Sequence, residues 1–218
     1  MITIHHLENS RSLRVIWLLE VLGVDYKVKR YERDPKTSLA PQELLKVSPL
    51  GKSPVLQIDE TILPETGAIF EYLLAHYDKE HQFHPQVEDS TYKDYVFWLH
   101  FAEGSLMWPL VMKTIFSKVT EKVPFFLKPF AKLIFMAVGK AYLNHTLQKC
   151  LEYIEKNLEQ KEFFLGSELS AADIIMSFPL EAAVETQIDM DSYPKIQEFV
   201  KKIQARKDYQ RAVERGKG

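Results

Sequence analysis

Cysteine and glycine are both scarce in this sequence of 218 residues, and each shortage excludes a class of protein. The one cysteine, Cys150, excludes an internal disulfide and any metal site built from several thiolates, and it fits a reducing compartment. The 8 glycines form neither a GxGxxG motif nor a P-loop, so the loops that cradle nucleotide phosphates are missing. We therefore expect no nucleotide-dependent chemistry, no metal site and no resident cofactor.

An excess of charge of one sign and a long hydrophobic run are also lacking. The 28 basic and 30 acidic residues give a net charge of −2, without the basic excess typical of nucleic-acid-binding proteins. The most apolar segment, from Val123 to Gly139, is interrupted by Lys128, Pro129 and Lys132 and is shorter than the ~20 residues of a membrane-spanning helix. The first residues show no secretion signal. These features predict a cytoplasmic protein that does not bind nucleic acid.

The first eighty residues alternate between strand and helix patterns. Short branched or alternating runs predict strands, and the apolar run that ends at Gly23 predicts a buried helix around Trp17. A hairpin is expected where two short strands meet at Asp59 and Glu60. The pattern predicts a small mixed sheet with helices on its faces. The expected strands are 3–6, 25–31, 54–58 and 61–63, and the expected helices are 12–22, a short one from 41, and 66–77.

The sequence pattern changes after Tyr77. Residues 81–87 belong to a polar stretch with a proline and no periodicity, which is typical of a linker. Beyond it only helix patterns occur, with breaks expected at Pro109, Pro124, Pro129, Gly166 and Pro194. The predicted fold class is therefore α/β plus all-α. A βαβαββα domain over residues 1–80 precedes an all-helical domain over residues 88–218.

Two short stretches carry candidate chemistry. Pro54 opens a strand after Ser53, and a cis peptide bond in that turn would leave the Ser53 backbone free to pair with an extended peptide. Thr66 lies where a helix begins, and the free N–H groups there suit a carboxylate, while Glu65 suits an ammonium group. Together, the helix start at Thr66 and the Glu65 carboxylate match the α-amino acid end of a small ligand. The alternatives are a plain turn and a plain helix cap.

In combination these stretches resemble the cytosolic glutathione S-transferases, and the resemblance covers nearly the whole chain. It is carried by PLGKSPVLQIDETILPETGAIFEYL, by GSELSAAD at 166–173, and by the opening HHLENSRSLRVIWLLEVLG. The opening is similar to the bacterial and fungal group with SRxxRxxWLL after the first strand. The resemblance implies a thioredoxin-like first domain and an enzyme that activates the thiol of glutathione, its co-substrate. Ser170 and Asp173 form a capping box, which we interpret as structural.

The resemblance also implies roles for individual residues. Lys52 would meet the glycyl carboxylate of glutathione, and the backbone of Ser53, beside a cis-Pro54, would pair with the cysteinyl unit. Glu65 and Thr66 would hold the γ-glutamyl end.

The turn after the first strand should supply the group that stabilises the thiolate. Lowering a thiol pKa of ~8.5 by ~2 units requires about 2.7 kcal/mol. A hydroxyl donor, at ~1.5–3 kcal/mol, together with a helix N-terminus, at ~0.3–1 kcal/mol, can supply that. Ser10 is the first candidate for this catalytic donor. Asn9 and Arg11 are alternatives, and Ser12 fits a helix cap.

The acceptor pocket should lie between the domains, with Phe101, Ser105 and Trp108 as its walls, although core packing is an alternative for each. The expected second substrate is a small apolar electrophile, and the resemblance implies a homodimer. Two other functions stay open, namely reduction of glutathione-linked disulfides or organic peroxides, and a non-catalytic binding module. A separate hypothesis concerns the segment from Val123 to Gly139. If it forms a helix with an exposed apolar face, that helix would contact a membrane surface.

Overall fold

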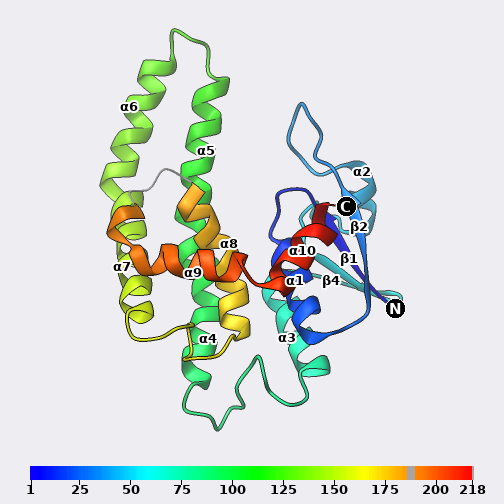
Figure 1. The fold of residues 1–218 in the computed structure, drawn as a ribbon. Coiled ribbons are helices and arrows are strands. Elements are labelled where there is room, and N and C mark those ends of the chain that lie inside the picture. The colour runs from blue at the N-terminus through cyan, green and yellow to red at the C-terminus, as the bar shows by residue number, and fades with distance from the viewer. Residues whose placement is uncertain (186–189, 218) are drawn as a thin grey trace.

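The computed structural model describes residues 1–185 and 190–217, and it shows a small sheet with helices followed by a helical part (Figure 1). This confirms the predicted fold class, and the strands and helices of the first part end within about two residues of their predicted limits. The elements of the first part are β1 (Ile2–Leu7), α1 (Ser12–Leu22), β2 (Tyr26–Tyr31), α2 (Gln42–Val47), β3 (Val55–Ile58), β4 (Thr61–Pro64) and α3 (Thr66–Tyr77).

The four strands of this sheet lie in the order β2-β1-β3-β4. β1 and β2 are parallel and joined through α1, whereas β3 runs antiparallel to both β1 and β4. Val55 pairs with His5 of β1 on one side and with Pro64 of β4 on the other. The register therefore brings the segments that follow β1, precede β3 and follow β4 to one edge of the sheet.

The second part of the described chain is helical from Tyr92 onward. The expected break at Pro109 is wrong, because the chain stays helical from Tyr92 to Lys122 through a π-helical stretch. Pro109 is the second residue of α5 and lies directly after the π-helical stretch, where the hydrogen-bonding pattern of the helix changes. The elements are α4 (Tyr92–Phe101), η1 (Ala102–Met107), α5 (Trp108–Lys122), α6 (Lys128–Val138), η2 (Gly139–Leu143), α7 (Asn144–Leu158), α8 (Ala171–Glu185), η3 (Met190–Ser192), α9 (Pro194–Gln204) and α10 (Lys207–Lys217).

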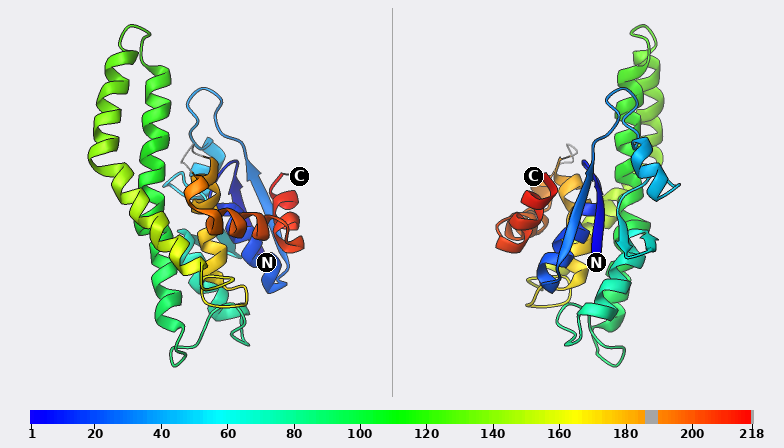
Figure 2. Two further views of the ribbon diagram at one scale, coloured as in Figure 1. Left: turned by 60° about the vertical axis from the view of Figure 1, so that its left-hand side comes forward. Right: turned by 90° about the vertical axis from the view of Figure 1, so that its right-hand side faces the viewer.

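One large hydrophobic core joins the two parts, and α1 lies at its centre. Trp17 is fully buried, as predicted, and α1 packs against α3, α8 and α10. In both views of Figure 2 the C-terminal helix α10 lies beside the sheet, so the end of the chain returns to its beginning. The two parts are thus held together by shared burial of apolar surface.

One half of the predicted capping box is present at the start of α8, where Asp173 binds back to Ser170, while the Asp173 N–H donates to the Ser170 carbonyl and not to its hydroxyl. The Asp173 carboxylate accepts hydrogen bonds from the Ser170 backbone N–H (2.8 Å) and the Ser170 hydroxyl (2.5 Å). It also accepts the Phe164 N–H at 2.7 Å, which closes the preceding loop. Burial raises the pKa of Asp173 to about 6 even though these bonds favour its charged form.

α5 and α6 form a hairpin that projects beyond the rest of the molecule (Figure 1). Pro124 lies between these helices, as expected of a break, and Pro129 lies in the first turn of α6. No side chain of α6 is buried, although most of its residues are apolar. Among the described residues, no helix is long and apolar enough to cross a membrane.

Candidate functional site

The turn after β1, the turn before β3 and the start of α3 meet at the sheet edge that the register defines. The Ser53–Pro54 peptide bond is cis, which confirms the prediction. The Ser53 hydroxyl donates to the His5 carbonyl (2.9 Å) and accepts the Leu7 N–H (3.1 Å), so its side chain binds the turn to β1. Lys52, next to it, is exposed.

α3 begins at Thr66, as the predicted range 66–77 has it, but its cap residue is Glu65 and not Thr66. Thr66 is the first helical residue and is buried, whereas Glu65 occupies the cap position with a positive φ of 76° and is exposed. β4 continues to Pro64, so Glu65 alone makes the turn into the helix. The Glu65 carbonyl accepts the Ile69 N–H at 3.0 Å, and the N–H groups of the first turn remain available to a ligand.

Ser10 lies in the turn after β1 and is 9% exposed. Its hydroxyl lies 2.7 Å from the Ser12 hydroxyl and donates toward the Ser53 hydroxyl at 3.3 Å. The structure thus brings Ser10 and Ser53 together from opposite sides of the sheet edge. The exposed Asn9 has a positive φ of 49°, and its carbonyl accepts a hydrogen bond from Arg33 at 3.3 Å.

Arg11 points toward the helical part, where it forms an ion pair with Glu103 of η1 at 2.8 Å. The buried Arg14 binds the same carboxylate, and it donates to the Ile175 carbonyl of α8 at 2.6 Å. Burial lowers the pKa of Arg14 to about 10. Arg11 and Arg14 thus connect α1 and its preceding turn to the helical part through Glu103. Sequence reasoning missed Glu103 because it lies about ninety residues away.

Two neighbouring histidines of β1 were not singled out from the sequence. The His6 Nδ1 lies 2.7 Å from the Ser12 hydroxyl, and the His5 Nδ1 lies 2.7 Å from the Tyr31 hydroxyl. Burial lowers the pKa of His6, and the nearby Arg30 charge lowers it further. No sequence signal marks Ser12 as a partner of His6, because strand and helix periodicity say nothing about contacts across a turn.

A cleft of about 1490 Å³ opens beside this turn. One wall comes from the ends of β1 and β2 with the start of α2, and the other comes from α8 and α10. Its lining mixes aromatic, apolar and charged side chains. Residues that frame it are Asn9, Ser10, Tyr31, Phe178, Tyr209 and Val213.

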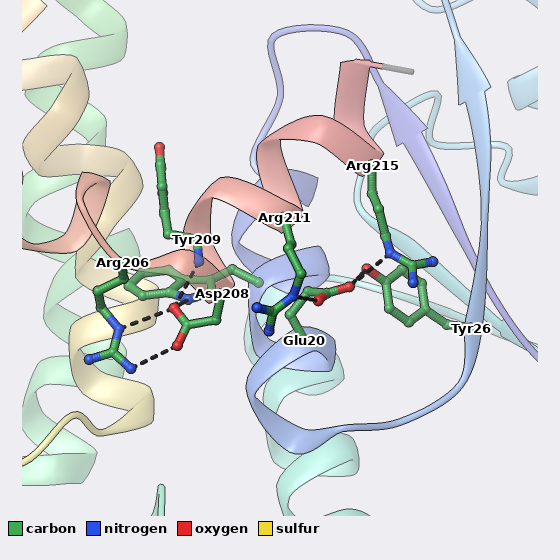
Figure 3. Close-up of polar contacts among 8 residues, drawn as sticks. Glu20, Tyr26, Arg206, Asp208, Tyr209, Arg211 and Arg215 are labelled. Atoms are coloured by element: carbon green, nitrogen blue, oxygen red, sulfur yellow. Dashed lines mark hydrogen bonds and ion pairs between the residues drawn. The ribbon is translucent and has the colours of Figure 1, made fainter.

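The wall formed by α10 is fixed to α1 and β2 by polar contacts (Figure 3). Glu20 of α1 pairs with Arg211 (2.8 Å) and Arg215 (2.9 Å) and accepts the Tyr26 hydroxyl (2.6 Å). The Trp17 indole N–H donates to Asp208 at 2.8 Å. Because these partners come from opposite ends of the chain, sequence spacing does not reveal this side of the cleft.

The three residues expected to line the acceptor pocket lie along α4, η1 and α5. Phe101 packs among aromatic rings that include Trp98 and Tyr153. The Ser105 carbonyl accepts from the Cys150 thiol at 3.8 Å, and Trp108 lies against Tyr142. They do not line the cleft beside Ser10.

Comparisons with known proteins agree across the chain. Residues 1–75 match the family model "Glutathione S-transferase, N-terminal domain", and residues 126–210 match "Glutathione S-transferase, C-terminal domain". Glutathione S-transferase 1 of Saccharomyces cerevisiae is 34% identical over 227 residues, covering 100% of this chain and 96% of the yeast protein.

Solved structures point the same way. A glutathione S-transferase from Actinobacillus pleuropneumoniae superposes with a TM-score of 0.83 at 35% identity, covering 100% of this chain and 94% of that one. A glutathione transferase homologue from Sulfitobacter, solved with bound glutathione, has a TM-score of 0.77 at 20% identity and covers 99% and 98% of the two chains. At that identity the likeness shows a common fold.

Proposed function

This chain belongs to the glutathione S-transferase family, and from that premise we propose that Ser10 stabilises the thiolate of glutathione. The protein is a glutathione transferase with glutathione as its co-substrate. The observation that carries the proposal is the position of the Ser10 hydroxyl, 3.3 Å from Ser53 in the cis-proline turn and at the start of α1. A hydroxyl there can donate to a sulfur that is held against this turn.

The two alternative donors have less support. Arg11 is held by Glu103 at 2.8 Å, so its guanidinium is directed toward the helical part. Asn9 is exposed, and water competes for its amide. Ser10 is nearly buried, where a hydrogen bond to an anion is stronger than in water.

Titration of the enzyme-bound glutathione thiol tests this proposal. We expect Ser10→Ala to raise the pKa of the bound thiol by about 1–2 units, because one donor to the anion is lost. Asn9→Ala should leave that pKa unchanged. The ultraviolet absorbance of the thiolate, followed against pH at saturating glutathione, measures it. A pKa that rises in Asn9→Ala and not in Ser10→Ala would transfer the role to Asn9.

We propose that glutathione lies along the sheet edge in the orientation that the family resemblance implies. The exposed Lys52 would meet the glycyl carboxylate, and the backbone of Ser53, before Pro54, would pair with the cysteinyl unit. The open N–H groups at Thr66 and the exposed carboxylate of Glu65 support a site for the γ-glutamyl end, since they complement its carboxylate and its ammonium group.

We propose the cleft between β2, α8 and α10 as the site of the second substrate. It adjoins Ser10, and its aromatic and apolar residues suit a small electrophile. If so, Phe178→Ala should raise the KM for the electrophile several-fold and leave the KM for glutathione unchanged. Trp108→Ala, a change at an expected wall outside this cleft, is the matched control. The opposite pattern would return the pocket to Phe101, Ser105 and Trp108.

The reductase alternative gains no support from a protein thiol. Cys150 is buried, burial raises its pKa, and it points to the Ser105 carbonyl within the helical part. A mixed disulfide on this residue would need the core to open. Substrate reduction would therefore have to proceed through glutathione alone.

We also propose a homodimer in the cytoplasm. Many exposed apolar residues belong to α5, α6 and the turn between them, and such an accumulation of exposed apolar side chains supports an interaction surface. We name these residues the hairpin patch and assign it to a second copy of the chain. They are Ile115, Val119, Phe125, Phe126, Leu127, Phe130, Leu133, Ile134, Met136 and Val138.

A further inference from the structure

Three side chains form a continuous hydrogen-bonded row from the candidate thiolate donor to β1. The Ser10 and Ser12 hydroxyl oxygens lie 2.7 Å apart, and the Ser12 oxygen lies 2.7 Å from the His6 Nδ1. All three residues are buried, with Ser12 fully so. Ser10 and His6 nevertheless both line the cleft between β2, α8 and α10, so each end of the row borders the proposed substrate site.

The direction of hydrogen bonding in this row is constrained. Each hydroxyl has one hydrogen, and the Ser53 hydroxyl gives its own to the His5 carbonyl. If every hydrogen points toward His6, Ser10 donates to Ser12, and Ser10 can only accept a hydrogen from glutathione. If every hydrogen points away from His6, Ser12 donates to Ser10, and the Ser10 hydrogen, which in the structure is directed at Ser53 at 3.3 Å, can turn to a thiolate.

These two arrangements match the two states of the thiol. A neutral S–H group donates to Ser10, whereas the thiolate needs Ser10 as its donor. Ser10 changes from acceptor to donor either by rotating its hydroxyl or by passing its own hydrogen to another acceptor while it takes up the thiol proton. The row supplies that acceptor through Ser12.

Building on the proposed function, we propose that His6 accepts the proton of the glutathione thiol through Ser12 and Ser10. The S–H bond breaks as its proton bonds to the Ser10 oxygen, the former Ser10 proton bonds to the Ser12 oxygen, and the former Ser12 proton bonds to the His6 Nδ1. The products are a thiolate that accepts from Ser10 and an imidazolium ring, with no net change in charge. The opposite ring nitrogen then releases its proton to solvent in the cleft.

The surroundings of His6 suit a transient proton acceptor. Its low pKa, caused by burial and by Arg30, keeps the ring neutral and ready to accept a proton near pH 7. For the same reason the ring does not retain the proton. Gly216 of α10 lies beside the ring, and a Cβ placed on it would come within 3.7 Å of the His6 Nε2. The absence of a side chain there leaves that nitrogen close to the cleft.

Rapid mixing of the protein with glutathione near neutral pH tests this role. The rise of thiolate absorbance gives the rate of ionisation, and its final amplitude gives the fraction ionised. His6→Asn keeps a polar partner for Ser12 but cannot take up a proton, and Ser12→Ala interrupts the row. We expect both to slow the rise by about 10²-fold while the amplitude stays near that of the wild type. His5→Asn, a change in the neighbouring buried histidine outside the row, should leave the rate unchanged.

The outcomes separate this inference from the proposed function. A lower amplitude in Ser10→Ala supports Ser10 as the thiolate donor, whatever the rates are. Unchanged rates in both His6→Asn and Ser12→Ala would overturn the role of His6 and assign proton removal to water. The wild-type protein gives a second measurement that needs no variant, namely the ionisation rate in mixtures of light and heavy water. A curved dependence on the deuterium fraction is expected for several protons in motion, and a linear one contradicts the proposal.

Discussion

The helices α6 and α10 are of equal length and opposite in character. α6 is mostly apolar, yet none of its side chains is buried. Six of the eleven residues of α10 are charged, yet α10 packs along α1 and buries Tyr209 and Ala212. The difference shows that the attachment of a helix within this subunit depends on matched partners more than on its own apolar content. The apolar surface of α6 is therefore available to a partner outside the subunit.

The largest effect should come from removing the aromatic anchor of α10. Tyr209 packs edge-on against Trp17, with ring centroids 5.2 Å apart, and its hydroxyl binds Glu181. We expect Tyr209→Ala to lower the free energy of unfolding by about 3 kcal/mol, measured by urea denaturation. Tyr142→Ala, at a ring that is 62% exposed, should change it by less than about 0.5 kcal/mol. Equal effects would show that α10 is no better anchored than the surface of the hairpin.

The hairpin patch should show the reverse behaviour. Phe130 is 67% exposed, so Phe130→Ala should leave the unfolding of the subunit nearly unchanged. It should raise the dissociation constant of the dimer about 30-fold, as loss of ~2 kcal/mol at an interface does. Sedimentation equilibrium measures this, with Val87→Ala, at a 69% exposed residue outside the patch, as the control.

A monomeric wild-type protein would contradict the assignment of the hairpin patch to a second copy. The segment 113–140 contains six lysines and one glutamate, so binding to anionic vesicles is the outcome that would assign the patch to a membrane surface. Phe130→Ala would then reduce vesicle binding instead of dimerisation.

The smallest effect concerns the ionic contacts of α10. Burial raises the pKa of Glu20, but hydrogen bonds from Tyr26 and Arg211 and the charge of Arg215 outweigh it, so that the net pKa is lowered. A carboxylate whose pKa is lower in the folded state contributes stability above its unfolded pKa, and this is lost as the pH falls.

Glu20→Gln should therefore lower stability by about 1 kcal/mol near neutral pH, because the arginines that bind Glu20 are half exposed. The difference from wild type should shrink as the pH falls below about 4.5. Urea denaturation at a series of pH values measures it. A difference that does not change with pH would mean that Glu20 acts through packing alone.

The sequence predicted local structure well where one residue type decides it. Gly23 adopts the left-handed conformation that ends α1, and Asp59 turns between β3 and β4 with a φ of 50°. The break predicted at Pro109 was wrong because a π-helical stretch leads directly into α5 at this point, and the sequence pattern does not reveal such a stretch. The predicted cap of α3 was wrong by one residue, because β4 extends to Pro64 and Glu65 is the residue that directly precedes the helix.

The candidate site likewise contains some residues that the sequence marks and others that it does not. The turn at Ser53 and Pro54 and the helix start at Thr66 stand out because proline favours a turn before a strand and threonine favours a helix start. His6, Glu103 and Phe178 do not stand out. Histidine, glutamate and phenylalanine occur on many surfaces and in many cores, and only their neighbours give them a role.

By itself the sequence determined the order of strands and helices, the burial of α1 and the two turns of the candidate site, because backbone preference and periodicity act over a few residues. The tertiary structure alone decided that Ser12 joins Ser10 to His6, that α10 closes the cleft against α8, and that α6 stays uncovered. These features depend on contacts between distant segments, and such contacts form only when the whole core is packed.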